Sequence, residues 1–171
     1  MMVVEEKEKK YLIHSFEKKD IWNREHIVYQ WFINKSESGS EKVKIIFDLT
    51  RLKLIYVRVK KQMIELGNNK KTVEYLDVNQ FDPEQMIGIP FVLKRRAIKD
   101  DVFLDKFIVS NGITEYLVEY EGKESVRDVC KEISVQKEVT DDINYYNQSM
   151  CVPFSKEDAK QLKFLMKIFK I

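Results

Sequence analysis

Hydrophobic and polar residues alternate in short runs along most of this chain, which is the pattern typical of β-strands. Brief turn signals such as "GNN", "KDD" and "NG" separate the runs, and the polar stretch "NKSESGSEK" reads as a hairpin loop. We expect eight strands, at 3–13, 26–33, 41–47, 52–66, 71–78, 90–98, 102–110 and 113–121. Short strands joined by tight turns predict a largely antiparallel meander or barrel.

Helical periodicity is clearest near the end of the sequence, at 155–169. Ser155 can cap this helix, and apolar residues from Ala159 to Phe169 recur at helical spacing along one face. The stretches at 16–22 and 124–133 predict two shorter helices. We therefore expect a few helices that flank a predominantly β structure.

Charged residues occupy alternate positions in several of the predicted strands. In "YLVEYEG", Glu119 and Glu121 share one face of the strand, while Tyr116, Val118 and Tyr120 share the other. The same alternation places these basic pairs on one face of their strands: Lys42 with Lys44, Arg58 with Lys60, and Lys94 with Arg96. An ordinary sheet whose charged face is solvated would give this pattern too.

The first strand does not fit an ordinary half-buried sheet. In "EEKEKKYLI" at 5–13, Glu6, Glu8 and Lys10 point to one side while Lys7 and Lys9 point to the other, so both faces carry charge. A closed barrel with a polar interior, and with its apolar faces turned outward under the helices, accommodates such a strand. Carboxylates and ammonium groups inside a cavity must neutralise one another or hold ions. This suggests a polyanion together with a divalent cation.

Composition limits the class of protein without choosing its function. The 171 residues, 44% hydrophobic and 34% charged, lack a linker that would divide them, so we expect one domain over 1–171, as a monomer or homodimer. No apolar run could span a bilayer and no secretory signal is visible, which predicts a cytoplasmic protein without membrane partners. A net charge of +2 argues against nonspecific nucleic-acid binding. Cys130 and Cys151 are expected to be inert thiols.

The order of charged motifs resembles the CYTH domain, the fold of the triphosphate tunnel metalloenzymes, which include class IV adenylate cyclases and thiamine triphosphatases. Glu6, Glu8 and Lys10 match the E-x-E-x-K strand that opens this domain. The later matches follow in the family's order: Lys42 and Lys44 for R-x-R, Arg58 and Lys60 for T-x-K, Lys94 and Arg96 for K-x-R, Asp105 after it, and Glu119 and Glu121 for the closing E-x-E. "KEVTDDINYYNQSM" at 137–150 is similar to the terminal E-V-T-x-D-x-x-Y-x-N segment.

The resemblance implies an α+β fold with a closed, eight-stranded, mainly antiparallel barrel that forms a triphosphate tunnel. It implies Mg²⁺ or Mn²⁺ held by Glu6, Glu8, Asp105, Glu119 and Glu121. The basic residues implied to clamp the substrate are Lys10, Lys42, Lys44, Arg58, Lys60, Lys94 and Arg96. The catalytic set implied is Glu6, Glu8, Lys10, Glu119 and Glu121.

The activity implied is metal-dependent hydrolysis of a small-molecule triphosphate, either inorganic tripolyphosphate or a nucleoside or organic triphosphate. Two alternatives stay open at this point. One is an adenylate cyclase, in which the ribose 3′ hydroxyl of ATP replaces water and the products are cyclic AMP and pyrophosphate. The other is a noncatalytic module that binds polyphosphate or RNA ends.

Overall fold

One antiparallel sheet dominates the protein. The computed structural model describes residues 2–6, 8–16, 23–36, 39–65 and 68–170, and of these it gives only the backbone at 2–6, 35–36, 65 and 68–69. The strands are β1 (Met2–Glu6), β2 (Lys9–Phe16), β3 (Arg24–Ser36), β4 (Gly39–Asp48), β5 (Lys53–Glu65), β6 (Asn68–Leu76), β7 (Pro90–Lys99), β8 (Val102–Val109), β9 (Tyr116–Tyr120), β10 (Ile133–Glu138) and β11 (Val152–Pro153). They pair in the order β1-β6-β5-β4-β3-β7-β8-β9-β2-β10, and β11 is added to β7.

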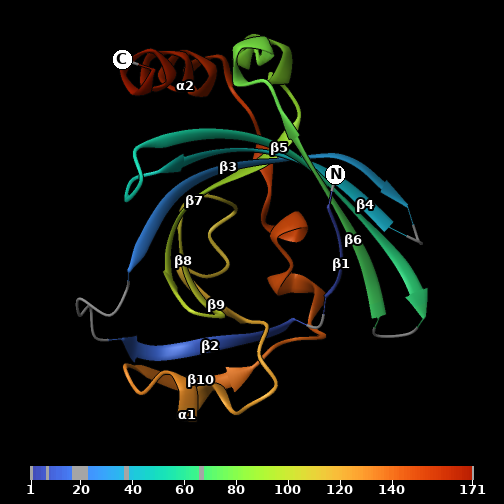
Figure 1. Cartoon of the computed structure of the whole chain (residues 1–171), viewed down its shortest axis with the longest axis vertical. Coiled ribbons are helices and arrows are strands. Elements are labelled where there is room, and N and C mark those ends of the chain that lie inside the picture. Colours follow the sequence, from blue (N-terminus) through green and yellow to red (C-terminus); the bar gives the residue numbers. More distant parts are fainter. Residues whose placement is uncertain (1, 7, 17–22, 37–38, 66–67, 171) are drawn as a thin grey trace.

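The sheet curls around a concave face, and short helical segments lie on both sides of it (Figure 1). The helices are α1 (Val126–Val129), α2 (Lys156–Phe169) and four 3₁₀ turns: η1 (Val78–Gln80), η2 (Pro83–Met86), η3 (Ile143–Tyr145) and η4 (Asn147–Met150). Figure 1 shows α2 outside the curl, across β3 and β5, and the orange segment with η3 and η4 inside it. Within the described residues, no helix is long and apolar enough to cross a membrane.

The expected closed, eight-stranded barrel is wrong. The sheet ends at β1 on one side and at β10 on the other, and among the described residues nothing pairs these two edges. The reason is visible at β2, which would have had to meet β1 to close a ring. One edge of β2 is paired with β9 and the other with β10, so no free edge is left for β1. The structure is therefore a β-rich open sheet with two α-helices in its described part.

Most of the predicted strands are present, and the main errors lie near the N-terminus and at residues 124–138. The single strand expected at 3–13 is two strands, β1 and β2, which lie far apart in the sheet order. The helix expected at 124–133 contains only the four-residue α1 and leads into β10, which was not predicted. The helix expected at 16–22 falls outside the described residues, except for Phe16 at the end of β2.

The main apolar core lies on the convex side of the sheet, beneath α2. Trp31 and Phe91 from the sheet are fully buried and pack with Phe154 in front of the helix. From α2, Ala159, Leu162 and Met166 enter the same core, and Phe169 packs edge-on against Phe47 of β4. Ser155 caps α2 through a reciprocal pair of hydrogen bonds with Asp158, which confirms the predicted start of the helix. The apolar faces of the central strands thus point outward, and their other face is free to carry charge.

Two leucines of α2 test this placement of the core. Leu162 is fully buried and Leu165 is 37% exposed, although they occupy the same helix. We expect Leu162→Ala to lower the free energy of unfolding by about 2–5 kcal/mol, because it removes a buried side chain and leaves a cavity. Leu165→Ala is the matched control and should cost less than about 1 kcal/mol. Urea unfolding measures both, and equal losses would contradict the arrangement.

Candidate functional site

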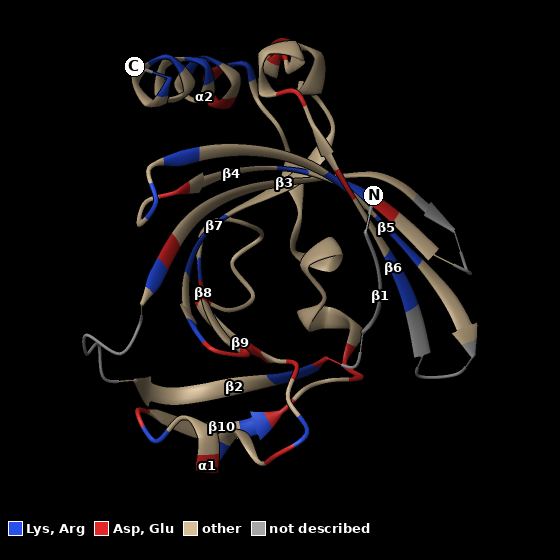
Figure 2. Ribbon diagram, viewed as in Figure 1, with Lys and Arg blue, Asp and Glu red and all other residues tan. Residues whose placement is uncertain are grey.

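Charged side chains from several strands share the concave face of the sheet. Directly opposed residues of antiparallel strands point to the same side, so the pairing register identifies this face. Lys44 of β4 lies opposite Gln30 of β3, which in turn lies opposite Val92 of β7, two residues before Lys94. Basic segments accordingly recur along the strands from β4 to β7 (Figure 2). The basic residues that we call the cationic set are Lys10, Lys42, Lys44, Lys61, Lys71, Lys94 and Arg96.

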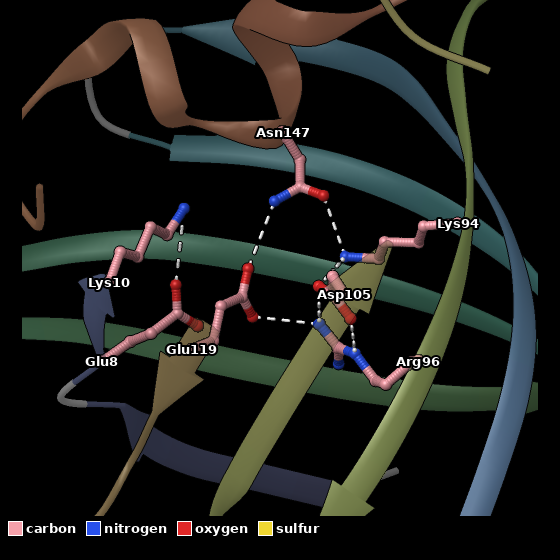
Figure 3. Close-up of polar contacts among 7 residues, drawn as sticks. All are labelled: Glu8, Lys10, Lys94, Arg96, Asp105, Glu119 and Asn147. Carbon is pink, nitrogen blue, oxygen red and sulfur yellow. Dashed lines mark hydrogen bonds and ion pairs between the residues drawn. The ribbon is translucent and has the colours of Figure 1, made fainter. Parts of the chain in front are cut away.

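Five of the inward-facing side chains form a closed ring of hydrogen bonds and ion pairs (Figure 3). The Arg96 guanidinium donates from Nε and Nη2 to the two carboxylate oxygens of Asp105, at 2.7 and 2.8 Å, and from Nη2 to Glu119 at 3.0 Å. The Lys94 ammonium lies 3.0 Å from Asp105 and donates to Asn147 Oδ1 at 2.8 Å. Asn147 Nδ2 closes the ring by donating to Glu119 at 3.2 Å. We call these five residues the buried ring.

The buried ring contains two cations, two carboxylates and one neutral amide, so its formal charge is zero. This balance is needed because Lys94 and Asp105 are almost completely removed from water. Burial alone would raise the pKa of Glu119, but Lys94 and Arg96 outweigh it and hold that pKa well below its ordinary value. The carboxylate of Asp105 is likewise kept ionised, its pKa lowered by Arg96 and Lys94 against the effect of burial. Neither carboxylate is therefore poised to accept a proton near neutral pH.

Lys10 borders the ring on β2, directly opposite Glu119 of β9. Its ammonium lies 3.5 Å from the Glu8 carboxylate and 4.9 Å from the centre of the Tyr146 ring. The backbone of Lys10 is fixed by Thr140, whose hydroxyl accepts from the Lys10 N–H at 3.2 Å. Lys10 is thus positioned both by the sheet and by the segment that carries η3 and η4.

Lys42 and Lys44 differ from the ring residues because no described residue forms an ion pair or a hydrogen bond with either ammonium group. Both side chains are half-buried on β4. Burial lowers the pKa of Lys44 well below the ordinary lysine value, and Arg96 and Lys94 lower it further by repulsion. Burial also lowers the pKa of Lys42, with further repulsion from Lys61 and Lys44. For Lys42, attraction to the Glu8 carboxylate opposes this lowering only in part, so repulsion among cations and burial dominate at both lysines.

The structure brings together six of the residues predicted for the site: Glu8, Lys10, Lys94, Arg96, Asp105 and Glu119. Lys42 and Lys44 share their face. Arg58 and Lys60 do not, because they lie opposite Val43 and Glu41, on the convex side of β5. There the Arg58 guanidinium lies 3.3 Å from the Glu41 carboxylate, and Lys60 is exposed.

The two remaining glutamates of the prediction lie outside the ring. Glu121 is exposed just beyond the end of β9, and its backbone N–H donates to Asp101. The backbone of Glu6 pairs with Asn69 of β6, and the Glu6 side chain lies outside the described part of the structure. The predicted catalytic set is therefore represented in the ring and its border by Glu8, Lys10 and Glu119.

Sequence reasoning missed three members of this face. Lys61 and Lys71 lie opposite each other on β5 and β6, on the same side as Lys42. The sequence signal for Lys61 was its place in the same alternation as Val57 and Val59. These three residues share one side of β5, and the pairing with β4 shows that this side is concave. Asn147 stands at the last position of the "EVTDDINYYN" segment, and that segment was noted without assigning the asparagine a contact.

The expectation of Mg²⁺ or Mn²⁺ stays a prediction. Within the part of the chain that the structure describes, no three His, Cys, Asp or Glu side chains gather into a group that could hold a metal ion. Asp105 has both oxygens bonded to cations, and Glu119 has both oxygens bonded to Arg96 and Asn147. Without Glu6, the described carboxylates do not form a divalent-cation site, and no chemical step is assigned to a metal.

Comparison with known proteins does not assign this chain to a family. No family model and no curated protein matches it. Among solved structures, it is similar to the PH1819 protein from Pyrococcus horikoshii OT3, with a TM-score of 0.42 and 12% sequence identity over 98% of this chain and 91% of that one. A likeness of this level transfers neither a fold assignment nor an activity, so the function must be argued from the concave face itself.

Removing one charge from the buried ring should destabilise the protein strongly. Asp105→Asn preserves the shape of the side chain but leaves Lys94 and Arg96 with a single carboxylate in a buried environment. We expect the free energy of unfolding to fall by about 3–5 kcal/mol, as is usual when one partner of a buried ion pair is lost. The control is Glu115→Gln, which removes a carboxylate 3.8 Å from Lys106 at an exposed site and should change stability by less than about 1 kcal/mol. Similar effects of the two changes in urea unfolding would refute the role of the ring.

Proposed function

We propose that the concave face binds a triphosphate and that the protein hydrolyses its terminal phosphoanhydride bond. The observation that carries this proposal is the cationic set, above all Lys42 and Lys44, whose ammonium groups form no ion pair with a described carboxylate and repel the neighbouring cations. Cations placed together at a sheltered site repel each other unless an anion joins them. A ligand with several negative charges would supply what this face lacks.

The spacing of the cations favours a short, multiply charged anion over a single phosphate. Lys42 and Lys44 lie two residues apart on one strand, so their Cα atoms are separated by roughly 7 Å. Lys61 and Lys71 lie on the next two strands, at a strand spacing of about 5 Å. A triphosphate chain presents oxygens over a comparable length. It could therefore contact several ammonium groups at once.

The ring itself keeps donors available for such a ligand. Lys94 is almost fully buried and bonded to Asp105 and Asn147, so it contributes positive charge to the face and no direct contact. Arg96 uses Nε and Nη2 for the ring, and no described residue bonds to its Nη1. These remaining donors, together with the lysines of β4, could withdraw negative charge from a phosphoanhydride as its bond breaks, which is the main requirement of phosphoryl transfer. This supports hydrolysis as the reaction that follows binding.

Titration with inorganic tripolyphosphate tests the binding step. We expect the Lys42→Met/Lys44→Met double variant to bind at least about tenfold more weakly than the wild type, because each charged hydrogen bond contributes about 1.5–3 kcal/mol. The matched control is Lys160→Met/Lys167→Met, which removes the same charge from exposed positions of α2. Isothermal titration calorimetry gives the dissociation constants. Equal weakening in both double variants would mean that only the net charge of the protein matters, which would contradict a site at Lys42 and Lys44. No binding by the wild type would refute the proposal.

Product analysis separates hydrolysis from the two alternatives. With tripolyphosphate or ATP, and with added Mg²⁺ or Mn²⁺, hydrolysis releases phosphate at a rate that falls in the Lys42→Met/Lys44→Met variant. Cyclic AMP and pyrophosphate formed from ATP would instead identify a cyclase. Binding that persists in chelator, with no product under any of these conditions, would leave a noncatalytic polyphosphate module.

The lowered pKa values of Lys42 and Lys44 predict that binding takes up protons. In the free protein these lysines lose their protons below the ordinary lysine value of 10.5, whereas an adjacent polyanion favours the charged form and raises the pKa again. At about pH 9 we therefore expect net proton uptake on binding tripolyphosphate, seen by calorimetry as a heat that depends on the ionisation enthalpy of the buffer. The uptake should disappear in the Lys42→Met/Lys44→Met variant. Proton release by the wild type would contradict the assignment.

A further inference from the structure

Asn147 is the one neutral member of the buried ring, and its orientation is fixed by the charges on either side. Its carbonyl oxygen accepts from the Lys94 ammonium, and its amino group donates to the Glu119 carboxylate. A reversed amide would place N–H against N–H and oxygen against oxygen. The Asn147 side chain thus lies between a cation and an anion and provides a hydrogen-bond partner for each.

The chain around Asn147 anchors it against the sheet at several points. The Val139 N–H donates to the Lys10 carbonyl, and Thr140 accepts from the Lys10 N–H. Tyr146, the residue before Asn147, places its ring under the Lys10 ammonium. Figure 1 shows this segment crossing the inside of the curl, while Figure 3 shows the Asn147 side chain reaching from it toward Lys94 and Glu119. The segment therefore contacts Lys94 of the buried ring and Lys10, which borders the ring.

We propose that Asn147 is a positioning residue of the anion site, which keeps the buried Lys94 ammonium and the Glu119 carboxylate apart, so that Glu119 stays bonded to Arg96 and the Arg96 guanidinium is directed at the bound polyanion. This inference rests on the proposed function. Asp105 and Asn147 are two fixed acceptors for the Lys94 ammonium, and Asp105 and Glu119 fix Nε and Nη2 of Arg96. Without Asn147, Glu119 could form a direct ion pair with Lys94 and leave Arg96.

The charged groups that face Lys94 come from four strands, and Asn147 acts among them. They are Arg96, Asp105, Glu119 and Lys44, whereas the nearby Cys151 is a neutral thiol because burial raises its pKa. Any test of Asn147 must keep their total charge constant. An exchange of chemical groups between positions 119 and 147 does so.

The exchange combines Glu119→Gln with Asn147→Asp. In the double variant the glutamine amide can donate to the new carboxylate, and that carboxylate can still accept from Lys94, so both hydrogen bonds and the net charge are restored. Alone, Asn147→Asp sets two carboxylates against each other, and Glu119→Gln sets two amides in contact without the charge that balances the ring. We expect each single variant to bind tripolyphosphate about tenfold more weakly and the double variant to return to within about threefold of the wild type.

Matched controls separate positioning from general disruption. Asn144→Asp makes the same chemical change at an exposed residue of the same segment. Alone it should bind as the wild type does, and combined with Glu119→Gln it should bind as weakly as Glu119→Gln does by itself. If Asn147→Asp does not fold, Asn147→Ser replaces it as the single variant, because a serine is too short to reach both partners. Thermal unfolding is recorded for every variant, and binding is compared among those that melt cooperatively.

The outcomes distinguish the positioning role of Asn147 from the proposed binding of a triphosphate. Recovery of affinity in the double variant, but not with Asn144→Asp, supports the positioning role. Binding by the wild type with losses that simply add in the double variant overturns the inference and leaves the proposed function standing. Binding that is unchanged in Asn147→Asp and Asn147→Ser overturns it as well. No binding of tripolyphosphate by the wild type overturns both.

Discussion

The contact between Asp105 and its two cations is the interaction on which the concave face depends. Asp105 has no exposed surface, and its carboxylate binds the Arg96 guanidinium through both oxygens while also neutralising Lys94. Without that carboxylate, two positive charges would stand side by side in a poorly solvated environment, at a cost of several kcal/mol. The central strands β7 and β8 can therefore turn charge inward because one fixed anion sits between two fixed cations.

The strands can carry charge on the concave side because their apolar side chains are buried on the convex side. Trp31, Phe91 and Phe47 pack outward, where Phe154, α2 and the turns η1 and η2 shield them from water. The C-terminal part of the chain serves both faces. It first crosses the concave side with η3 and η4, contributing Asn147 to the ring, and then passes to the convex side, where α2 completes the core. Core and site are thus built by opposite faces of the same strands.

The alternation of charged and apolar residues in the sequence predicted many residues of the concave face, but it could not predict all of them. Lys94, Arg96 and Glu119 were placed correctly on one side, because each strand alternates cleanly over the residues concerned. In β5 the run of charges from Arg58 to Lys61 includes residues of both faces, and only pairing with β4 shows that Lys61 points inward while Arg58 and Lys60 do not. The same limit explains why a closed barrel was wrongly predicted. Alternation in 3–13 gives no sign that the chain leaves one edge of the sheet at Glu6 and re-enters near the other at Lys9.

The concave face divides into a half that is electrically complete and a half that is not. Around Asp105 and Glu119, cations and carboxylates balance, and every ring member has a partner. Across from them on β4, Lys42 and Lys44 are held in a partly desolvated position that lowers their pKa values, with no described carboxylate bonded to either. A fold selected for stability alone would gain by replacing these two lysines with apolar residues, since their neighbours Val57 and Val59 already make that surface apolar. The proposed anion would complete the charge balance of this half and would itself be oriented by the half that is already complete.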